Sequence, residues 1–255
     1  MRNFKMILQY EGTRYQGWQK QESTDNTIQG KLEALLAKMT GQKIEVQGSG
    51  RTDAGVHALA QVANFHADTK MQTDEIMKYM NFYLPEDIAV ISLKEVPERF
   101  HSRLNAKGKT YCYRVINSEV PHVFDRRFCH IVEEKLDLEE MKKAAKYLVG
   151  THDFKAFTSN KRSKKSTVRT INEIQIEKTV STSMLLTGQQ DEIRFTYSGN
   201  GFLYHMVRIM TGTLLEVGTH KRKPEEIVGI LASGQRENAG QLAPAKGLTL
   251  MEVRY

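Results

Sequence analysis

The sequence has little cysteine, no long apolar run and no visible leader, and each absence excludes a class of protein. Cys112 and Cys129 are the only two cysteines among 255 residues. No secretory signal precedes the strand-like pattern that starts at Phe4, so we expect reduced thiols and a cytoplasmic location. No CxxC pair is present to support a metal site. No apolar run approaches the roughly 18 residues of a membrane span, so we expect no transmembrane segment.

What the sequence does contain is the composition of a folded protein with an excess of positive charge. Hydrophobic residues make up 40% and charged residues 26% of the chain, as in an ordinary globular protein. A chain of this length can bury a substantial core as one large domain or two small ones. The net charge of +7 favours a polyanionic partner. A basic protein without a nucleic acid partner would have the same balance, so charge alone does not decide.

Positive charge is concentrated in two short clusters. One is residues 161–165 together with Arg169, and the other is residues 220–223. The serine, threonine and asparagine residues around the first cluster are typical of a loop. Such loops suit contacts with phosphate groups, with a strong dependence on salt. For each cluster by itself, a solvated loop is the alternative interpretation.

Hydrophobic periodicity predicts the element order β-α-β-β-α-β over roughly the first hundred residues. Asp25 or Asn26 can cap the first helix, Gly41 can end it, and Pro85 stops the second helix. The predicted elements are strand 4–10, helix 27–39, strands starting at 44 and 59, helix 73–82 and strand 88–96. This is the ferredoxin-like order.

The second part of the chain repeats a similar pattern. The predicted elements are strand 109–117, helix 138–149, strands 170–177 and 192–197, helices 201–217 and 224–233, and strand 248–255. We therefore predict an α+β fold of two ferredoxin-like halves, residues 1–104 and 105–255. The halves would form a mostly antiparallel sheet with helices packed on it. Sites tend to lie in clefts, so we expect the site in a central cleft between the halves.

The most unusual stretch is residues 48–58, GSGRTDAGVHA, which combines three glycines with an arginine, an aspartate and a histidine. Glycine permits a close approach of another molecule to the backbone. Asp53 precedes an apolar strand, so we expect it on a loop anchored to a rigid sheet. In an extended chain Arg51 and Asp53 project to the same side, and the guanidinium favours an ionised, nucleophilic carboxylate. The alternative is that Asp53 caps a turn and Arg51 is its surface partner.

Aromatic residues and one further arginine are weaker candidates by themselves. Tyr15 and Trp18 either pack in the core or stack on bases, and we favour packing. Tyr111 lies on a predicted strand, where it is either a half-buried aromatic or a group that contacts a flat base. Arg208 lies among apolar residues of a predicted helix, where a surface position is the default.

The octamer at residues 50–57 resembles the active-site signature of the tRNA pseudouridine synthase A family. Five further stretches resemble motifs of this family, in the same order and over nearly the whole chain. These are residues 15–19, 100–103, 109–114, 202–208 and 243–248. One departure is Thr249, where related proteins commonly carry tyrosine, which puts a packing or base-contact detail in doubt.

The resemblance implies isomerisation of uridine at positions 38, 39 and 40 of the tRNA anticodon stem-loop. Asp53 would attack the sugar C1′ or the base C6, and Tyr111 would contact the target uridine and handle its C5 proton. Arg51 and Arg208 would hold and ionise Asp53, with Arg208 reaching it from the other half. The family acts on tRNA as a homodimer and needs no metal, nicotinamide or ATP cofactor. Its mechanism requires no catalytic histidine.

Two rival functions stay open on the sequence. A non-catalytic RNA-binding or RNA-folding protein would share the basic loops but would not need Asp53. A nucleoside or glycoside hydrolase usually needs two carboxylates that flank the bond, and residues 48–58 contain one.

Overall fold

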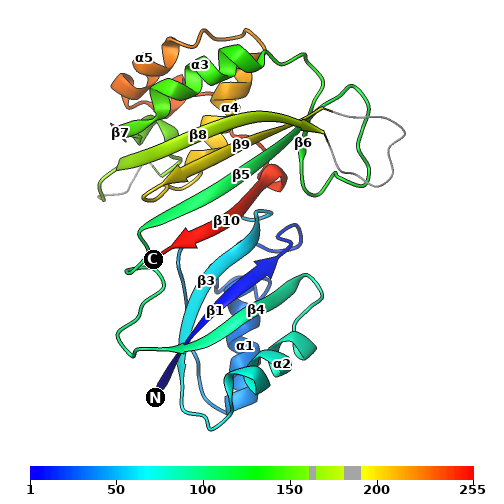
Figure 1. Ribbon diagram of the computed structural model, residues 1–255, viewed down its shortest axis with the longest axis vertical. Coiled ribbons are helices and arrows are strands. Elements are labelled where there is room, and N and C mark those ends of the chain that lie inside the picture. The colour runs from blue at the N-terminus through cyan, green and yellow to red at the C-terminus, as the bar shows by residue number, and fades with distance from the viewer. Residues whose placement is uncertain (161–164, 181–190) are drawn as a thin grey trace. The chain divides into compact units, whose positions relative to one another are not determined.

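The computed structural model describes residues 1–160, 165–180 and 191–255 (Figure 1). The chain forms two compact units: residues 1–107 with 249–255 are unit 1, and residues 108–248 are unit 2. Within the described ranges, no helix combines the length and the apolar character needed to cross a membrane. The structure is a mixed α+β fold with mostly antiparallel strands, which confirms the predicted fold class at this level.

Unit 1 is a sheet with two helices. Its elements are β1 (Arg2–Tyr10), α1 (Ile28–Thr40), β2 (Val46–Gly48), β3 (His57–Ala67), α2 (Thr73–Tyr83), β4 (Ile88–Val96) and β10 (Leu248–Arg254). β1 pairs antiparallel with both β3 and β4. One end of β3 also pairs antiparallel with β2, and its other end pairs parallel with β10. The last strand thus belongs to unit 1, whereas the sequence boundary grouped residues 105–255 as one half.

The core of unit 1 lies between this sheet and α1. Phe4 on β1 is the register partner of Phe65 on β3, and their rings stack with centroids 5.2 Å apart. Leu32 and Leu36 of α1, four residues apart on one face of the helix predicted at residues 27–39, are fully buried. Burial of these side chains fixes the position of β3, and β3 directly follows the loop that contains Asp53.

The start of α1 differs from the prediction, whereas its end agrees. The N-cap is Thr27, whose side chain accepts a hydrogen bond from the Gly30 N–H, and not Asp25 or Asn26. The Asn26 amide donates instead to the Arg14 carbonyl, so Asn26 belongs to the preceding turn. Gly41 ends the helix in the left-handed conformation with φ of 70°.

In the described residues of unit 2, three α-helices cover the strands (Figure 1). Its elements are β5 (Gly108–Asn117), β6 (His130–Val132), α3 (Leu138–Leu148), β7 (Gly150–Asp153), η1 (Lys155–Phe157), β8 (Val168–Val180), β9 (Asp191–Gly199), α4 (Met206–Gly218), α5 (Glu226–Ser233), η2 (Arg236–Asn238) and η3 (Ala245–Gly247). β5, β9, β8 and β7 are neighbours in that order and pair antiparallel, while β6 pairs parallel with β5.

The helices of unit 2 confirm one prediction and correct another. The predicted helix 138–149 is confirmed as α3, and its buried face consists of Met141, Ala144, Ala145 and Leu148. The predicted helix 201–217 was wrong at its start, because α4 begins at Met206. His205 has a positive φ of 66°, which a right-handed helix cannot continue through. Residues 201–205 therefore lie outside the helix, and Tyr204 and His205 form a turn before it.

Candidate active site

Buried polar side chains of the unit 1 sheet form hydrogen bonds with the loop that carries Arg51 and Asp53. The Tyr10 hydroxyl and the Thr52 hydroxyl are hydrogen-bonded at 2.8 Å. Gln61 accepts a hydrogen bond from the Ser49 hydroxyl at 2.7 Å and donates one to the Gly50 carbonyl at 3.0 Å. Gln61 is fully buried, so loss of these bonds would leave polar groups without water. The backbone on the N-terminal side of Asp53 is therefore fixed.

The segment before α1 also forms hydrogen bonds with this loop. The Trp18 N–H donates to the Thr52 carbonyl at 3.0 Å. The Gly12 N–H donates to His57 Nδ1 at 3.0 Å, so this ring nitrogen is an acceptor. Within the loop, the Val56 N–H donates to the Asp53 carbonyl at 3.1 Å and closes a turn. His57 is buried, and as an acceptor for the Gly12 N–H it has a structural role.

Close packing of this segment against the loop requires glycine at position 17. Gly17 has φ of 90°, and an added Cβ would lie 2.8 Å from the Thr52 carbonyl oxygen and 3.2 Å from the Ala54 nitrogen. Tyr15 and Trp18 on either side of it are buried, which confirms the packing interpretation of these two aromatics.

Asp53 and Arg51 differ in exposure. The Asp53 side chain is half-buried, whereas Arg51 is exposed and its Nε donates to Gln19 Oε1 at 2.8 Å. Burial raises the pKa of the neighbouring Tyr10 to about 12, so this hydroxyl stays neutral beneath the loop. Asp53 is thus a carboxylate on a rigid loop, and the buried hydroxyl that holds this loop, that of Tyr10, is neutral. Ionisation of Asp53 by Arg51 stays a prediction.

Tyr111 and Tyr113 lie on β5 in unit 2. Tyr111 is largely buried and packs edge-on against Phe202, with ring centroids 5.1 Å apart. The Tyr113 hydroxyl donates to the Pro244 carbonyl at 2.8 Å, and burial raises the pKa of this hydroxyl. Tyr113 therefore anchors residues 243–248, one of the stretches that carry the family resemblance.

Arg208 lies on α4 and is half-buried, not fully at the surface. Its Nε donates to the Ala243 carbonyl at 2.8 Å, and the Ala243 N–H donates back to the Arg208 carbonyl at 3.2 Å. Of the four predicted site residues, Arg51 and Asp53 share a loop of unit 1, and Tyr111 and Arg208 belong to unit 2.

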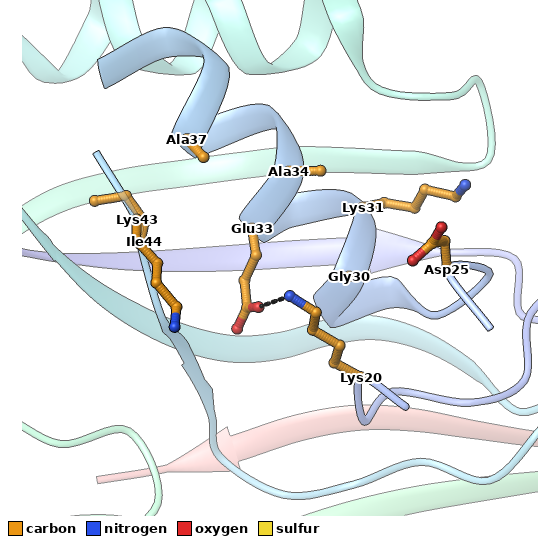
Figure 2. A pocket seen from close by; sticks show the side chains of 9 residues that line it. All are labelled: Lys20, Asp25, Gly30, Lys31, Glu33, Ala34, Ala37, Lys43 and Ile44. Carbon is orange, nitrogen blue, oxygen red and sulfur yellow. Dashed lines mark hydrogen bonds and ion pairs between the residues drawn. The ribbon is translucent and has the colours of Figure 1, made fainter. Parts of the chain in front are cut away.

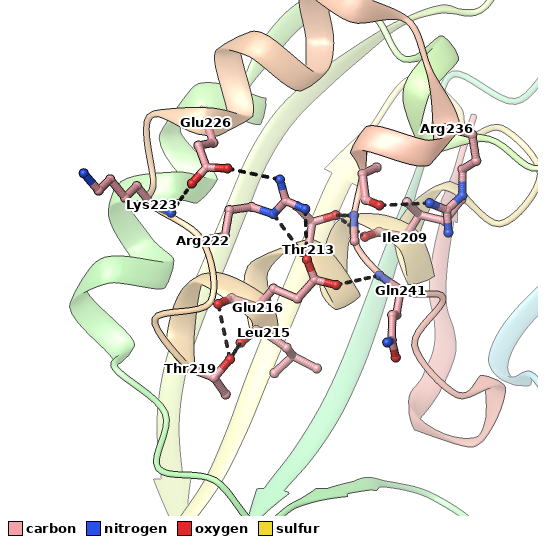
Figure 3. A network of polar contacts seen from close by, with 12 residues as sticks. Ile209, Thr213, Leu215, Glu216, Thr219, Arg222, Lys223, Glu226, Arg236 and Gln241 are labelled. Carbon is pink, nitrogen blue, oxygen red and sulfur yellow. Dashed lines mark hydrogen bonds and ion pairs between the residues drawn. The ribbon is translucent and has the colours of Figure 1, made fainter.

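The basic cluster at residues 220–223 is engaged in ion pairs within unit 2. Figure 3 shows the Arg222 guanidinium between the carboxylates of Glu216 and Glu226, which it contacts at 3.1 and 3.3 Å. Glu216 also accepts from the Gln241 N–H at 2.9 Å, and Lys221 pairs with Glu134 at 2.7 Å. These cations stabilise the unit itself, which weakens the prediction that they contact phosphate. Residues 161–164 of the other cluster lie outside the described residues.

A hollow beside α1 contains none of the four predicted site residues. Figure 2 shows Lys20, Lys31 and Lys43 around it together with Asp25 and Glu33, and its volume is about 350 Å³. Lys20 pairs with Glu33 at 3.1 Å. Among the described residues, no group of three or more histidine, cysteine, aspartate or glutamate side chains is arranged to hold a metal ion.

The residues that support the loop, above all Tyr10 and Gln61, were not predicted from the sequence. A signal for Gln61 was present, because it is a polar residue within a mostly apolar strand. Such a residue is buried only when its hydrogen bonds are satisfied. Its partners Ser49 and Gly50 could not be named from the sequence, since their approach depends on the pairing of β2 with β3.

Comparison with known proteins identifies the family of this chain. The model of the tRNA pseudouridine synthase family matches residues 6–105 and 144–255, and the chain belongs to this family. A tRNA pseudouridine synthase A from Bacillus sp. (strain KSM-64) is 46% identical over the full length of both chains. A tRNA pseudouridine synthase A 1 from Clostridium tetani is 48% identical, and a tRNA pseudouridine synthase A from Acetivibrio thermocellus 44%, again over both full lengths.

Proposed function

We propose that this chain is a tRNA pseudouridine synthase, an isomerase that converts uridine to pseudouridine with Asp53 as nucleophile. The observation that carries the proposal is the seating of Asp53. Its loop is hydrogen-bonded to Gln61, Tyr10 and Trp18. Such a fixed loop suits a carboxylate that must be positioned accurately against one atom of a substrate. The full-length similarity to proteins named tRNA pseudouridine synthase A supports the same assignment.

The proposed reaction rearranges one nucleotide without any net loss or gain of atoms. Asp53 attacks either C1′ of the ribose or C6 of the uracil, and the C1′–N1 bond breaks. The freed ring turns and C5 forms a new bond to C1′. The C5 proton is then removed, N1 gains a proton, and the aspartate is released for the next turnover. No electrons are exchanged with another molecule, so no redox cofactor takes part.

The remaining predicted residues have supporting roles in this proposal. Arg51 and Arg208 keep Asp53 ionised and assist in opening the stem, and Tyr111 contacts the uridine and handles its C5 proton. The edge-on contact with Phe202 holds the Tyr111 ring in one orientation, which supports a positioning role. Attack on a paired base requires the nucleotide to leave its stack, at a cost of a few kcal/mol that phosphate contacts offset.

The proposed substrate is the anticodon stem-loop of tRNA, at positions 38, 39 and 40, and the proposed active form is a cytoplasmic homodimer. We further propose that residues 1–104 and 105–255 are two ferredoxin-like halves that together supply the site. In unit 1 the antiparallel strand order β4-β1-β3-β2 supports this for the first half.

The experiment that tests the proposal compares Asp53→Ala and Asp53→Asn with the wild type. Pseudouridine is mapped by reverse transcription after carbodiimide labelling of a tRNA that carries uridine at positions 38 to 40. Both variants should form no detectable product while still binding the tRNA. Asp68→Asn is the matched control, because Asp68 is an exposed acid on the turn after β3, and it should react as the wild type does.

Three results would contradict the proposal. Unchanged product formation by Asp53→Ala would exclude Asp53 as the nucleophile. Release of free uracil would indicate a hydrolase. Tight tRNA binding by a wild-type protein that forms no pseudouridine would favour the non-catalytic RNA-binding function.

A further inference from the structure

Tyr204 is an exposed aromatic residue at the turn that precedes α4. Its side chain is 54% exposed, and its ring stacks on the His205 imidazole with centroids 3.7 Å apart and an interplanar angle of 26°. A tyrosine ring stacked on an imidazole has few orientations available. Tyr204 is therefore a flat, oriented surface that remains open to water.

The turn that displays Tyr204 is held by hydrogen bonds to the segment after η1. Thr158 Oγ1 donates to the Tyr204 carbonyl at 3.0 Å, and the Ser159 N–H donates to the same oxygen at 3.4 Å. The Ser159 hydroxyl and His205 Nδ1 are hydrogen-bonded at 2.9 Å. His205 adopts a positive φ of 66° in this turn, a costly conformation for a residue with a side chain. The structure thus maintains an unfavourable backbone conformation that keeps an aromatic ring exposed.

A cation lies on the same stretch of unit 2. The Arg169 Nε lies 3.7 Å from the position of an added Cβ at Gly201, three residues before Tyr204. Arg169 Nη1 donates to the carbonyls of Ser166 and Val168, and no carboxylate in the described part of the chain pairs with it. This guanidinium differs from Arg222, whose charge Glu216 and Glu226 neutralise. Arg169 therefore keeps its positive charge for an external anion.

We propose that Tyr204, supported by His205, stacks on an unpaired base of the tRNA, and that Arg169 contacts a phosphate of the same strand. This inference rests on the proposed function and adds a substrate-binding surface to it. Aromatic stacking next to a cation is the arrangement by which proteins hold single-stranded nucleotides, because every base has a flat face and every linkage a charge. An apolar protein partner would instead need a wider apolar surface than one exposed ring.

The first test measures tRNA affinity at equilibrium in full-length protein that carries Asp53→Asn, so that no turnover occurs. Tyr204→Ala and Tyr204→Leu should each raise the Kd roughly 5- to 150-fold, because leucine keeps apolar bulk but cannot stack as a flat ring. Tyr204→Phe should bind like tyrosine, because stacking does not need the hydroxyl. Tyr147→Ala is the matched control, since Tyr147 is an exposed tyrosine on α3 of the same unit, and it should leave the Kd unchanged.

The second test separates the charge from the ring by the salt dependence of binding. Arg169→Gln should lower the slope of log Kd against log salt by about 1, as expected for one lost phosphate contact. Tyr204→Leu should shift the affinity without this change in slope. Lys178→Gln is the control, because Lys178 already pairs with Asp191 at 2.7 Å. An unchanged slope in Arg169→Gln would overturn the phosphate contact.

A positive readout comes from tRNA substituted with 5-bromouridine. Irradiation should attach the RNA to Tyr204, as found by mass spectrometry of the peptide, and Tyr204→Leu should abolish this adduct. The inference would be overturned if Tyr204→Ala bound tRNA with the same Kd as the protein that keeps Tyr204. It would also be overturned if Tyr147→Ala weakened binding as much as Tyr204→Ala does. In either case, pseudouridine formation by the wild type on the same tRNA would show that the inference fails alone. Absence of that product would instead mean that the proposed function has failed.

Discussion

Replacement of Gly17 by alanine should disturb the Asp53 loop directly, and the size of the effect follows from two contributions. Gly17 has φ of 90°, and a side chain in this region costs about 1–2 kcal/mol. The added Cβ would also lie 2.8 Å from the Thr52 carbonyl oxygen, which is backbone and cannot swing away. Such overpacking typically costs a further 1–3 kcal/mol or so. We expect Gly17→Ala to lower the free energy of unfolding by about 2–5 kcal/mol.

Gly41 offers a matched control for this substitution. Its φ is 70°, and nothing lies within 4 Å of an added Cβ. Gly41→Ala should therefore pay the conformational cost of about 1–2 kcal/mol without touching the Asp53 loop. Urea denaturation followed by circular dichroism measures both losses, and the difference between the two variants isolates the contact with Thr52.

Catalysis should separate the two variants more sharply than stability does. A displaced Thr52 carbonyl moves the backbone that carries Asp53, and a shift approaching 1 Å in a reacting group can cost on the order of 100-fold in rate. We expect kcat/KM for pseudouridine formation to fall about 10- to 100-fold in Gly17→Ala and to stay at the wild-type value in Gly41→Ala. Equal activity and equal stability of the two alanine variants would refute the inference that Gly17 positions the loop.

Two further predictions concern buried ionisable groups of unit 2. Burial opposes ionisation of Glu192, but hydrogen bonds from Arg114 and Arg194 outweigh it and lower the pKa of this carboxyl. Glu192→Gln should cost about 1.5–3 kcal/mol near neutral pH, because it removes the charge-assisted hydrogen bonds that Glu192 accepts from Arg114 and Arg194. Because the pKa of Glu192 is lower in the folded state than in the unfolded state, its carboxylate stabilises the fold fully above the unfolded pKa of about 4.3. This stabilisation is lost as the pH falls through the folded pKa. Urea titrations from neutral to acid pH should show the gap between wild type and Glu192→Gln narrowing, and a constant gap would contradict the assignment. Burial raises the pKa of Cys129 to about 11, so this thiol should react with an aromatic disulfide reagent at pH 7.5 far more slowly than free cysteine. Rapid labelling of Cys129 in the folded protein would contradict its burial.

Elements with a strong local pattern were predictable from the sequence. The strand at residues 88–96 has the predicted bounds, and the helix predicted at residues 138–149 is α3, which ends one residue earlier. Both signals depend on the spacing of apolar side chains along a single segment. Such spacing specifies which face of an element is buried, whatever that face packs against.

The ends of elements and the partners in hydrogen bonds and ion pairs were less predictable, because neighbouring residues compete for the same interactions. Asn26 was a reasonable cap for α1, yet it bonds to the Arg14 carbonyl and leaves Thr27 as the cap. The helical pattern also extends back from α4 through residues 201–205, but His205 with its positive φ interrupts the helix. The cluster at 220–223 has a basic sequence, and only the fold brings Glu216 to Arg222.

The sequence by itself determined the order of the elements and the motif around Asp53, and through that motif the family. The tertiary structure decided what holds Asp53 in place, since Gln61 and Tyr10 reach its loop from two paired strands. It also decided which aromatic is buried and which is exposed, as Trp18 and Tyr204 show. The physical reason is that a hydrogen bond or a contact between distant residues depends on strand register and packing. Neither is encoded in any one segment, because both emerge only when several segments share a core.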